Sequence, residues 1–241
     1  MTLSSIFNRL NREIRSMTFS LPVAYVYNPL EYAKKPHETY LRLYGTSPRE
    51  VLLLGMNPGP FGMAQTGVPF GEITVTREWL KIEEAVQQPP RTHPKRPVEG
   101  FDCKKSEVSG RRLWGWAKSR FINPETFFDR YFVANYCPLI FIEEGGRNRT
   151  PDKLPKAERE PLFEACDRAL IDLVDYFSPS YLVGVGAFAE KRAQVCLKEK
   201  NGLTIGKITH PSPANPRANR GWEAFIEKEL TALGIEDFSL Y

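Results

Sequence analysis

Residues 51–63 read Val-Leu-Leu-Leu-Gly-Met-Asn-Pro-Gly-Pro-Phe-Gly-Met. The first five are apolar or glycine, which favours a strand buried on both faces. The next eight are rich in proline and glycine, so they predict a stiff loop that begins with Met56 and Asn57. A buried strand that runs directly into an ordered loop is typical of parallel sheets, whose ligands bind beyond the carboxyl ends of the strands.

Three further apolar runs predict buried strands in the same sheet. They span residues 131–135, 181–185 and 203–208. Helical patterns separate the strands and span residues 76–86, 109–120, 157–177, 187–198 and 219–233, the last with Asn219 as N-cap and Gly234 as C-cap. Because strands alternate with helices, we expect an α/β fold of three layers, α/β/α, around a central, mostly parallel four-stranded sheet.

The chain is long enough to form a substantial core. It has 241 residues, of which 41% are hydrophobic, and a chain of this length removes roughly 70% of its extended surface from water on folding. No repeat, low-complexity tract or flexible linker divides it, so we expect a single domain over residues 1–241. The apolar runs are too short for a membrane span, and the amino terminus does not resemble a secretory signal. We therefore expect a monomer without membrane contact that is intracellular, in the cytoplasm of a bacterium or the nucleus of a eukaryote.

The four cysteines lie far apart in the sequence, at Cys103, Cys137, Cys166 and Cys196. Zinc and iron–sulfur sites usually contain two cysteines within a few residues, because ligands on one turn limit the entropy lost on metal binding. The spacing therefore predicts free, buried thiols, with no metal site and no disulfide framework.

The excess positive charge is concentrated in two stretches. The net charge is +4, and residues 91–112 alone hold seven basic residues against three acidic ones. Residues 207–220 form a second basic stretch without an acidic residue. Such clusters suit a polyanion, since each lysine or arginine on a phosphate releases a counterion, although a solvated loop can have the same composition.

Polar side chains accompany the ends of three predicted strands. Asn57 follows the first strand, Asn135 ends the second and His210 follows the last. Alone, each has an ordinary explanation as a turn former, a partner of backbone groups or a cap; together they predict a site at one edge of the sheet. The sequence has no Gly-x-Ser-x-Gly elbow and no phosphate-binding loop, which argues against acyl and phosphoryl transfer. Gly184 and Gly186 mimic part of a dinucleotide motif, but the next strand ends without the required acid, so we expect them to serve strand-to-helix packing.

The loop after the first strand points to a family. Residues 55–71, Gly-Met-Asn-Pro-Gly-Pro-Phe-Gly-Met-Ala-Gln-Thr-Gly-Val-Pro-Phe-Gly, and residues 210–216, His-Pro-Ser-Pro-Ala-Asn-Pro, resemble two motifs of the single-strand-selective monofunctional uracil-DNA glycosylases. Shorter matches occur at residues 93–97, 106–110 and 135–139, and the likeness covers residues 25–234. The resemblance implies an enzyme of the uracil-DNA glycosylase superfamily. Such an enzyme flips a deaminated or oxidised pyrimidine out of DNA and cuts its N-glycosidic bond without a metal or other cofactor, leaving an abasic site.

The resemblance also implies two catalytic residues. Asn57 matches the residue that holds the attacking water, and His210 matches the group that faces O2 of the base. This agrees with the chemistry, because cleavage gives the sugar oxocarbenium character and the departing base negative charge. A neutral amide can orient water for late attack on a cationic sugar, and an imidazole donor can stabilise the anion.

Four residues match the family's base pocket. Phe70 would stack on the flipped base, and Asn135 would read its imide edge, which distinguishes uracil from cytosine. Gly59 stands where glycosylases of another branch carry a tyrosine that excludes thymine, and Met56 lies beside it in the same loop. Xanthine presents the same imide as uracil, so we expect weaker release of xanthine if the Gly59 side has room for a second ring.

The proline-rich loop after His210 matches the wedge that enters DNA, so the implied partners are single- and double-stranded DNA with damaged bases. Ala214 stands where relatives often carry a long basic residue. Either Asn215 or Arg217 takes over the role of that residue, or the activity on double-stranded DNA is weak. Lys104 and Lys105 would bind phosphates. The predicted DNA-binding residues are thus Pro211, Ser212, Pro213, Ala214, Asn215, Arg217, Lys104 and Lys105.

Two other classes of function fit the same fold. A catalytically silent nucleic-acid-binding protein would keep the basic loops but leave uracil in DNA. A nucleotide-binding metabolic enzyme would bind free mononucleotides and produce no abasic sites.

Overall fold

A parallel sheet lies at the centre of the structure, a computed structural model that describes residues 1–236 and residue 238. Its strands are β2 (Val51–Gly55), β3 (Tyr131–Asn135), β6 (Tyr181–Val185) and β7 (Thr204–Ile208), in the order β3-β2-β6-β7. β2 and β3 are buried along their whole length, as their apolar sequences predict. The four predicted strands are confirmed, with the last beginning one residue later than expected.

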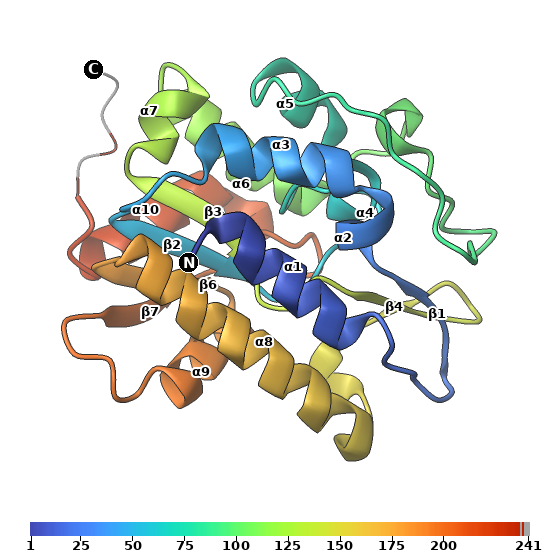
Figure 1. The fold of residues 1–241 in the computed structure, drawn as a ribbon. Helices are drawn as coiled ribbons and strands as arrows, with labels where there is room; N and C mark the ends of the chain where they lie inside the picture. Colours follow the sequence, from blue (N-terminus) through green and yellow to red (C-terminus); the bar gives the residue numbers. More distant parts are fainter. Residues whose placement is uncertain (237, 239–241) are drawn as a thin grey trace.

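Helices cover both faces of this sheet. In Figure 1, α1 (Leu3–Ile14), α3 (Lys34–Tyr44) and α8 (Lys156–Phe177) lie in front of it, and α6 (Val108–Arg120) and α10 (Trp222–Ala232) lie behind it. The short helices are α2 (Pro29–Tyr32), α4 (Met63–Thr66), α5 (Ile73–Glu78) and α7 (Pro124–Phe128). The arrangement confirms the predicted three-layer α/β class.

α9 (Ala187–Cys196) packs closely on β6. A Cβ atom at Gly184 would lie 2.4 Å from the backbone nitrogen of Glu190, which is shorter than any real contact of this kind. Gly184 therefore serves strand-to-helix packing, as predicted, because only a glycine lets this helix approach the strand so closely.

The predicted helix at residues 76–86 is wrong. α5 (Ile73–Glu78) begins three residues earlier and ends well before residue 86. Beyond it, Leu80 and Ile82 are buried in a non-helical segment, and Lys81 has a φ of 55°. The apolar spacing that resembled a helix comes from an irregular segment that packs on the core.

The last helix is also shorter than predicted. α10 begins at Trp222 and is not capped by Asn219, whose side-chain oxygen instead accepts a hydrogen bond from Arg112. At the other end, Leu233 is the C-cap, and Gly234 follows it with a φ of 86°. Asn219 lies in a short 3-10 turn, Ala218–Arg220, and Gly221, with a φ of 105°, separates this turn from α10.

A second, antiparallel sheet was not predicted. It contains β1 (Val23–Tyr27), β4 (Ile140–Glu143) and β5 (Asn148–Arg149) in the order β1-β4-β5, and it lies at the right of Figure 1. β5 has only two residues, too few for a local signal. β1, with the sequence Val-Ala-Tyr-Val-Tyr, carries a strand signal that the sequence analysis missed, although its pairing with β4, more than a hundred residues away, has no local signal. This sheet brings Asn148 to the end of the central sheet where the pocket described below lies.

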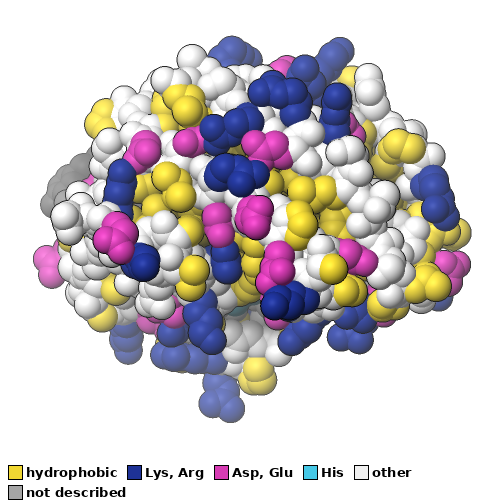
Figure 2. Space-filling view, turned by 60° about the horizontal axis from the view of Figure 1, so that its bottom comes forward, with side chains coloured by type: hydrophobic (Ala, Val, Ile, Leu, Met, Phe, Trp, Pro, Cys, Tyr) yellow, Lys and Arg dark blue, Asp and Glu magenta, His cyan; other side chains and the backbone are white. Residues whose placement is uncertain are grey.

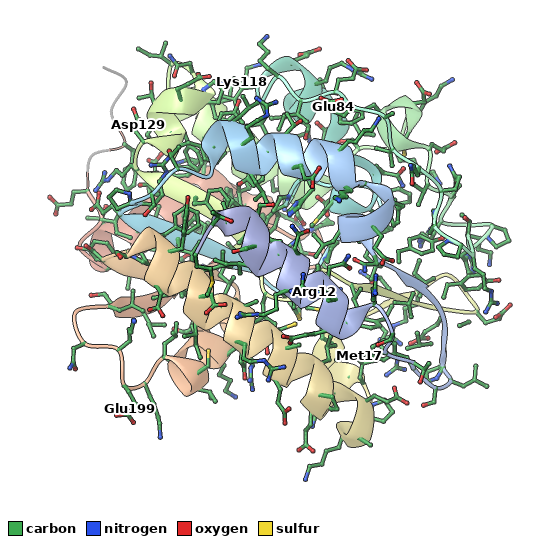
Figure 3. The ribbon with its side chains drawn as sticks, viewed as in Figure 1. Arg12, Met17, Glu84, Lys118, Asp129 and Glu199 are labelled. Carbon is green, nitrogen blue, oxygen red and sulfur yellow. The ribbon has the colours of Figure 1, made fainter. Side chains whose placement is uncertain are left out.

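Aromatic side chains fill the space between the sheet and its helices. Figure 3 shows side chains packed throughout the interior, with the labelled Lys118, Asp129 and Glu199 at the periphery. The largest fully buried side chains include Tyr40, Trp114, Trp116, Phe127 and Phe132. No helix in the described part of the chain is both long enough and apolar enough to cross a bilayer.

The cysteines follow the prediction of buried thiols in three of four cases. Cys103, Cys137 and Cys166 are buried, whereas Cys196 is only partly buried near the end of α9. Burial raises the pKa of the Cys196 thiol to about 11, which keeps it in the unreactive thiol form at neutral pH.

Candidate active site

A pocket of about 360 Å³ lies beyond the carboxyl ends of the central strands. It brings together Asn57, Asn135 and His210, the three polar residues expected there from separate strand ends. Its lining residues are Met56, Asn57, Pro58, Gly59, Phe70, Glu107, Ser109, Asn135, Asn148, Thr150, His210 and Ser212.

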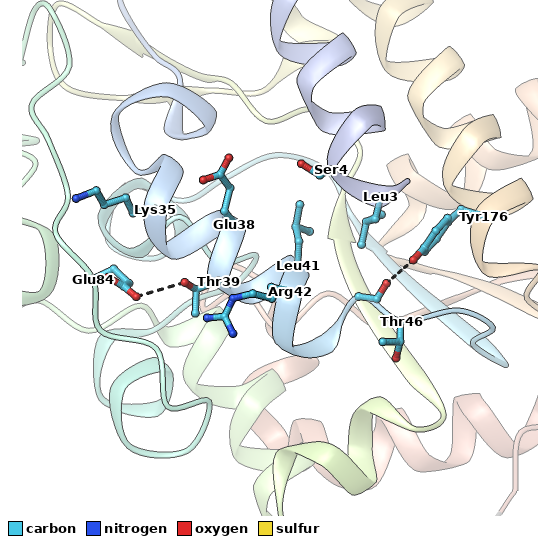
Figure 4. A pocket seen from close by; sticks show the side chains of 11 residues that line it. Leu3, Ser4, Lys35, Glu38, Thr39, Leu41, Arg42, Thr46, Glu84 and Tyr176 are labelled. Carbon is cyan, nitrogen blue, oxygen red and sulfur yellow. Dashed lines mark hydrogen bonds between the residues drawn. The ribbon is translucent and has the colours of Figure 1, made fainter. Parts of the chain in front are cut away.

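A larger pocket, of about 610 Å³, lies elsewhere on the molecule, between the start of α1, the helix α3 and Tyr176 (Figure 4). Charged side chains, including Lys35, Glu38 and Arg42, project around it. It contains none of the residues that the sequence predicts for the site, so size alone does not identify the functional pocket.

Asn57 is oriented by a backbone carbonyl. Its Nδ2 donates a hydrogen bond of 3.2 Å to the carbonyl oxygen of Leu139, just before β4. This bond fixes the plane of the amide and directs its oxygen away from Leu139. The amide oxygen is therefore available to accept a hydrogen bond from a water molecule in the pocket.

Asn135 forms part of the pocket floor at the end of β3. Its Nδ2 donates to the sulfur of Met63 at 3.3 Å, while its Oδ1 is buried without a partner in the described part of the chain. A Cβ atom at Gly55 would lie 2.3 Å from that Oδ1. Glycine at the end of β2 therefore makes room for the amide, and the Met63 contact gives it a preferred orientation.

Phe70 adopts an unusual backbone conformation beside this amide. Its φ is 54°, and its carbonyl oxygen accepts a 2.7 Å hydrogen bond from the backbone N–H of Glu72. The indole of Trp114 bonds the preceding carbonyl, that of Pro69, at 3.3 Å. These contacts offset the strain of a positive φ and hold the ring 6.3 Å from that of His210, measured between ring centroids.

His210 is held as a neutral hydrogen-bond donor. The backbone N–H of Ser212 donates to its Nδ1 at 3.0 Å, so the proton of the neutral ring is on Nε2. Burial lowers the pKa of His210 to about 4, which keeps the ring uncharged at neutral pH. Gly186, with a φ of 97°, lies against the imidazole, and a Cβ atom there would be 3.3 Å from the histidine Cβ.

The residues on either side of His210 are tied to two helices. Arg112 on α6 donates to the carbonyl oxygen of Pro211 and to Oδ1 of Asn219, both at 2.8 Å. The indole of Trp222 on α10 donates to the carbonyl oxygen of Thr209 at 2.6 Å. The loop is therefore stiff, as its prolines predict, and Arg112 serves it rather than standing free for a polyanion.

Asn215 and Arg217, the two residues expected to replace a long side chain at position 214, both contact other groups of the protein. Ala214 is exposed, and its N–H bonds the Ser212 hydroxyl at 3.1 Å. Asn215 donates its Nδ2 to the His210 carbonyl at 3.2 Å. Arg217 lies 3.4 Å from the Glu229 carboxylate and over the ring of Phe225, and position 214 itself presents only a methyl group.

Lys104 and Lys105 are exposed in the segment that leads into α6. Nζ of Lys105 lies 5.0 Å from the ring centroid of Phe61, two residues beyond Gly59, and Arg96 lies over the same ring at 5.4 Å. This places basic groups near the pocket rim. Figure 2 shows one face of the molecule, where basic and acidic side chains are interspersed and basic ones gather along its edges.

Glu107 is a pocket residue that the sequence reasoning missed. A Cβ atom at Gly59 would lie 2.1 Å from its Oε1, so the carboxyl group fills the space beside that glycine. Glu107 therefore leaves less room for a second ring beside Gly59 than the sequence suggests, and the release of xanthine stays a prediction. The residue lies within the motif at residues 106–110, but only the folded chain brings it to Gly59.

Asn148 was missed for the same reason. Its Nδ2 donates to the carbonyl oxygen of Pro58 at 3.3 Å, and its Oδ1 is buried without a partner among the described residues. It reaches the pocket from β5, a two-residue strand that no sequence pattern indicated.

Comparison with known proteins places the chain among DNA glycosylases. Residues 43–231 match the model of the uracil DNA glycosylase superfamily. The chain is 49% identical over 228 residues to the single-strand selective monofunctional uracil DNA glycosylase of Bos taurus, covering 94% of this chain and 84% of the relative. It is 49% identical over 231 residues to the Rattus norvegicus protein of the same name, covering 94% and 82%. The crystal structure of wild-type Pedobacter heparinus SMUG2 superposes with a TM-score of 0.67 at 18% identity, covering 97% of each chain, and supports the fold.

Proposed function

The chain belongs to the uracil-DNA glycosylase superfamily, and from this premise we infer that it is a monofunctional uracil-DNA glycosylase of base excision repair. It flips uracil out of DNA and hydrolyses the N-glycosidic bond to leave an abasic site. The observation that carries this function is the convergence of Asn57, Asn135 and a neutral His210 in one pocket at the strand ends.

His210 stabilises the departing base in this proposal. As the glycosidic bond breaks, the base gains negative charge at O2, and a donor aimed at that oxygen is worth more in the transition state than in the ground state. The Ser212 N–H supports this role, because it accounts for a proton on Nε2 rather than Nδ1. A neutral imidazole also avoids placing a cation beside the developing cationic sugar.

Asn57 positions the water that attacks C1′. Its amide is uncharged and is a poor base, but a sugar with oxocarbenium character needs an oriented nucleophile more than a strong one. The bond from Nδ2 to Leu139 supports this role, because it engages the amide nitrogen and leaves the oxygen of this pocket-lining side chain as the acceptor.

Asn135 selects the base by its hydrogen-bonding edge, and Phe70 stacks on it. The unpartnered Oδ1 of Asn135 suits N3–H of uracil, and the remaining Nδ2 proton suits O4. Cytosine presents the opposite pattern at these positions. Met63 supports the discrimination, because an amide flip would replace its N–H···S contact by an oxygen facing sulfur.

DNA binding uses the pocket rim. Lys104 and Lys105 contact phosphates, and the loop from Pro211 to Asn215 enters the space that the flipped base leaves. Because Ala214 ends in a methyl group and its neighbours are engaged elsewhere, we propose a preference for single strands and weakened pairs. We propose that the enzyme acts as a monomer in the compartment that contains its DNA substrate, the cytoplasm of a bacterium or the nucleus of a eukaryote.

The function is tested with end-labelled oligonucleotides that carry one uracil, presented as single strands and as duplexes. Alkali converts each abasic site into a strand break that a gel resolves. We expect breaks that depend on uracil and form faster in the single strand, without added metal. Tight binding with no breaks would instead identify a catalytically silent binder, and binding of free mononucleotides alone would identify a nucleotide-binding enzyme.

A further inference from the structure

Asn148 brings an unpaired hydrogen-bond acceptor to the wall of the base pocket. It lines the pocket from β5, and its Nδ2 donates to the carbonyl oxygen of Pro58 at 3.3 Å. Its Oδ1 is buried and has no hydrogen-bond partner among the described residues. Because an unpaired buried acceptor is unfavourable, a donor that reaches it is bound favourably.

Asn57 is held in the same way on the neighbouring loop. Its Nδ2 donates to the carbonyl oxygen of Leu139 at 3.2 Å, which leaves its Oδ1 as an acceptor. Pro58, which anchors the amide of Asn148, directly follows Asn57 in the chain, and all three residues line one pocket. The pocket therefore contains two anchored amides, and the group that each has left to use is an oxygen.

A DNA substrate offers few donors to these oxygens. Deoxyribose and the phosphodiester carry no N–H or O–H group, and uracil in DNA carries only N3–H. Under the proposed function, that donor bonds Oδ1 of Asn135. Water is then the donor that remains for Asn148, and it is small enough to approach an oxygen that the protein almost completely covers.

Two acceptors orient a water molecule better than one. A water bound by a single acceptor can rotate about that hydrogen bond, so its lone pairs sample many directions. When both of its O–H groups are engaged, a lone pair has a fixed direction and can be aimed at C1′ before the glycosidic bond breaks.

We propose that Asn148 is a second water-positioning residue, and that its Oδ1 and Oδ1 of Asn57 accept the two hydrogen bonds of one attacking water. The water oxygen bonds to C1′, and the bond from C1′ to the base breaks with its electron pair on the base. One water proton passes to solvent, and the departed base takes up a proton from solvent. The inference rests on the proposed function, because it assumes that glycosidic bonds are hydrolysed in this pocket.

The first test separates the acceptor of Asn148 from its donor. Asn148→Ala removes both groups, whereas Asn148→Asp keeps an acceptor and loses the donor to Pro58. With single-stranded uracil substrate and saturating enzyme, Asn148→Ala should lower the single-turnover rate by about tenfold, and Asn148→Asp should keep most of it. A normal rate in Asn148→Ala would overturn the proposal. So would an aspartate variant as slow as the alanine variant, since Asn148 would then only anchor the loop.

Arg149→Ala is the matched control on the same strand. The Arg149 side chain donates to the Glu143 carboxylate and to the carbonyl oxygen of Lys153, both at 2.9 Å, and does not line the pocket. We expect a nearly unchanged rate. A loss equal to that of Asn148→Ala would assign the effect to a disturbed β5 and overturn the proposal.

The second test uses methanol as a competing nucleophile and begins with the unmodified protein. Methanol has a single O–H group, so it cannot satisfy both amides. Its attack releases uracil but leaves a 1′-O-methyl sugar, which does not break in alkali. We expect the unmodified protein to prefer water by at least about tenfold over the molar ratio in the solvent, and Asn148→Ala to lose most of this preference. Methanol attack in proportion to its concentration in the unmodified protein would overturn the proposal without relying on any variant.

The third test combines the two asparagines. If both hold one water, the rate of Asn57→Ala with Asn148→Ala should be close to that of the slower single variant. If the two losses multiply, the residues act independently, and the proposal is overturned.

Uracil release by the unmodified protein separates the two levels of inference. If no uracil is released, the proposed function fails. If uracil is released but the rate and the choice between water and methanol do not depend on Asn148, only the inference about Asn148 fails.

Discussion

The backbone N–H of Ser212 donates a 3.0 Å hydrogen bond to Nδ1 of His210. The histidine ring is neutral at pH 7, because burial lowers its pKa to about 4. Its Nε2 must therefore carry the proton, and the donor that the departing base requires is fixed before the substrate binds.

His210→Ala should lower the single-turnover rate of uracil release by about a hundredfold or more, because the anion loses a prearranged donor. His210→Gln, whose amide reaches a similar distance, should keep more of the rate. Binding of uracil-containing single strands, measured separately, should change little. A variant that binds more weakly but cleaves normally at saturation would make His210 a binding residue instead.

Asn57→Ala should lower the chemical step by at least about tenfold, since the water at C1′ loses its orienting acceptor. The Leu139 carbonyl would keep its place in the chain, so the pocket should remain intact. Affinity for uracil-containing DNA should stay close to that of the unmodified protein, because no phosphate contact is removed. Near-normal single-turnover cleavage would exclude the water-positioning role.

Met63→Leu should weaken the discrimination between uracil and cytosine. The sulfur of Met63 accepts from Nδ2 of Asn135, and leucine of similar size offers no acceptor. We expect uracil release to fall severalfold while the ratio of cytosine to uracil release rises. Asn135→Ala is the control, because it should lower uracil release without favouring cytosine. If the ratio stays constant in Met63→Leu, packing rather than sulfur orients the amide.

Local sequence patterns were sufficient to predict the central sheet and three members of the site. The strand at residues 51–55 is apolar throughout because both of its faces are covered, and a polar residue directly after such a strand can only lie at the sheet edge. Asn57 and Asn135 follow this logic, whereas His210 comes after β7, an edge strand that is only partly buried.

Long-range packing hid the remaining features. In the sequence, Glu107 is an ordinary acidic residue at the start of a helix, and only the fold places its carboxyl group beside Gly59. Asn148 lies on a strand of only two residues. In the sequence, Arg112 belongs to a cluster of basic residues, whereas in the structure it donates to the carbonyl oxygen of Pro211. No local pattern encodes these contacts, because each depends on segments that are distant in the sequence.

His37 predicts a specific loss of stability in acid. It is buried on α3, where its Nδ1 bonds the carbonyl oxygen of Gly67 at 2.9 Å, and burial lowers its pKa from 6.5 to about 4. Between these values the unfolded chain binds a proton that the folded chain does not, so stability falls as the pH is lowered from about 6.5 to 4.

His37→Asn removes this titration but keeps a donor for Gly67. The difference between the two proteins in free energy of unfolding, measured by urea at several pH values, should change by up to about 3 kcal/mol over this range. The pKa of His210 is lowered like that of His37, so its titration also makes stability fall in acid. The pKa of Glu107 is raised, so its titration has the opposite effect on stability. Both are present in each protein and cancel in the comparison. Parallel stability curves would show that His37 does not titrate as described.

Ala214→Arg should raise activity on duplex DNA more than on single strands. The loop that carries Ala214 is held by Arg112 and Trp222, so a long side chain at its exposed tip would project from a fixed base. A flipped nucleotide leaves a gap in the duplex stack, and a methyl group cannot fill it, whereas an arginine side chain can occupy the gap and stabilise the extrahelical state.

Uracil in a base pair should accordingly be released several times faster by Ala214→Arg, roughly up to tenfold, because extrusion from a duplex costs a few kcal/mol of which the side chain recovers part. Ala214→Leu separates filling from charge, since it occupies the gap without attracting phosphates. If filling is the cause, both variants improve duplex cleavage and leave the single-strand rate nearly unchanged. An equal gain on single strands and duplexes, restricted to the arginine variant and abolished by salt, would mean that the added charge merely strengthens DNA binding.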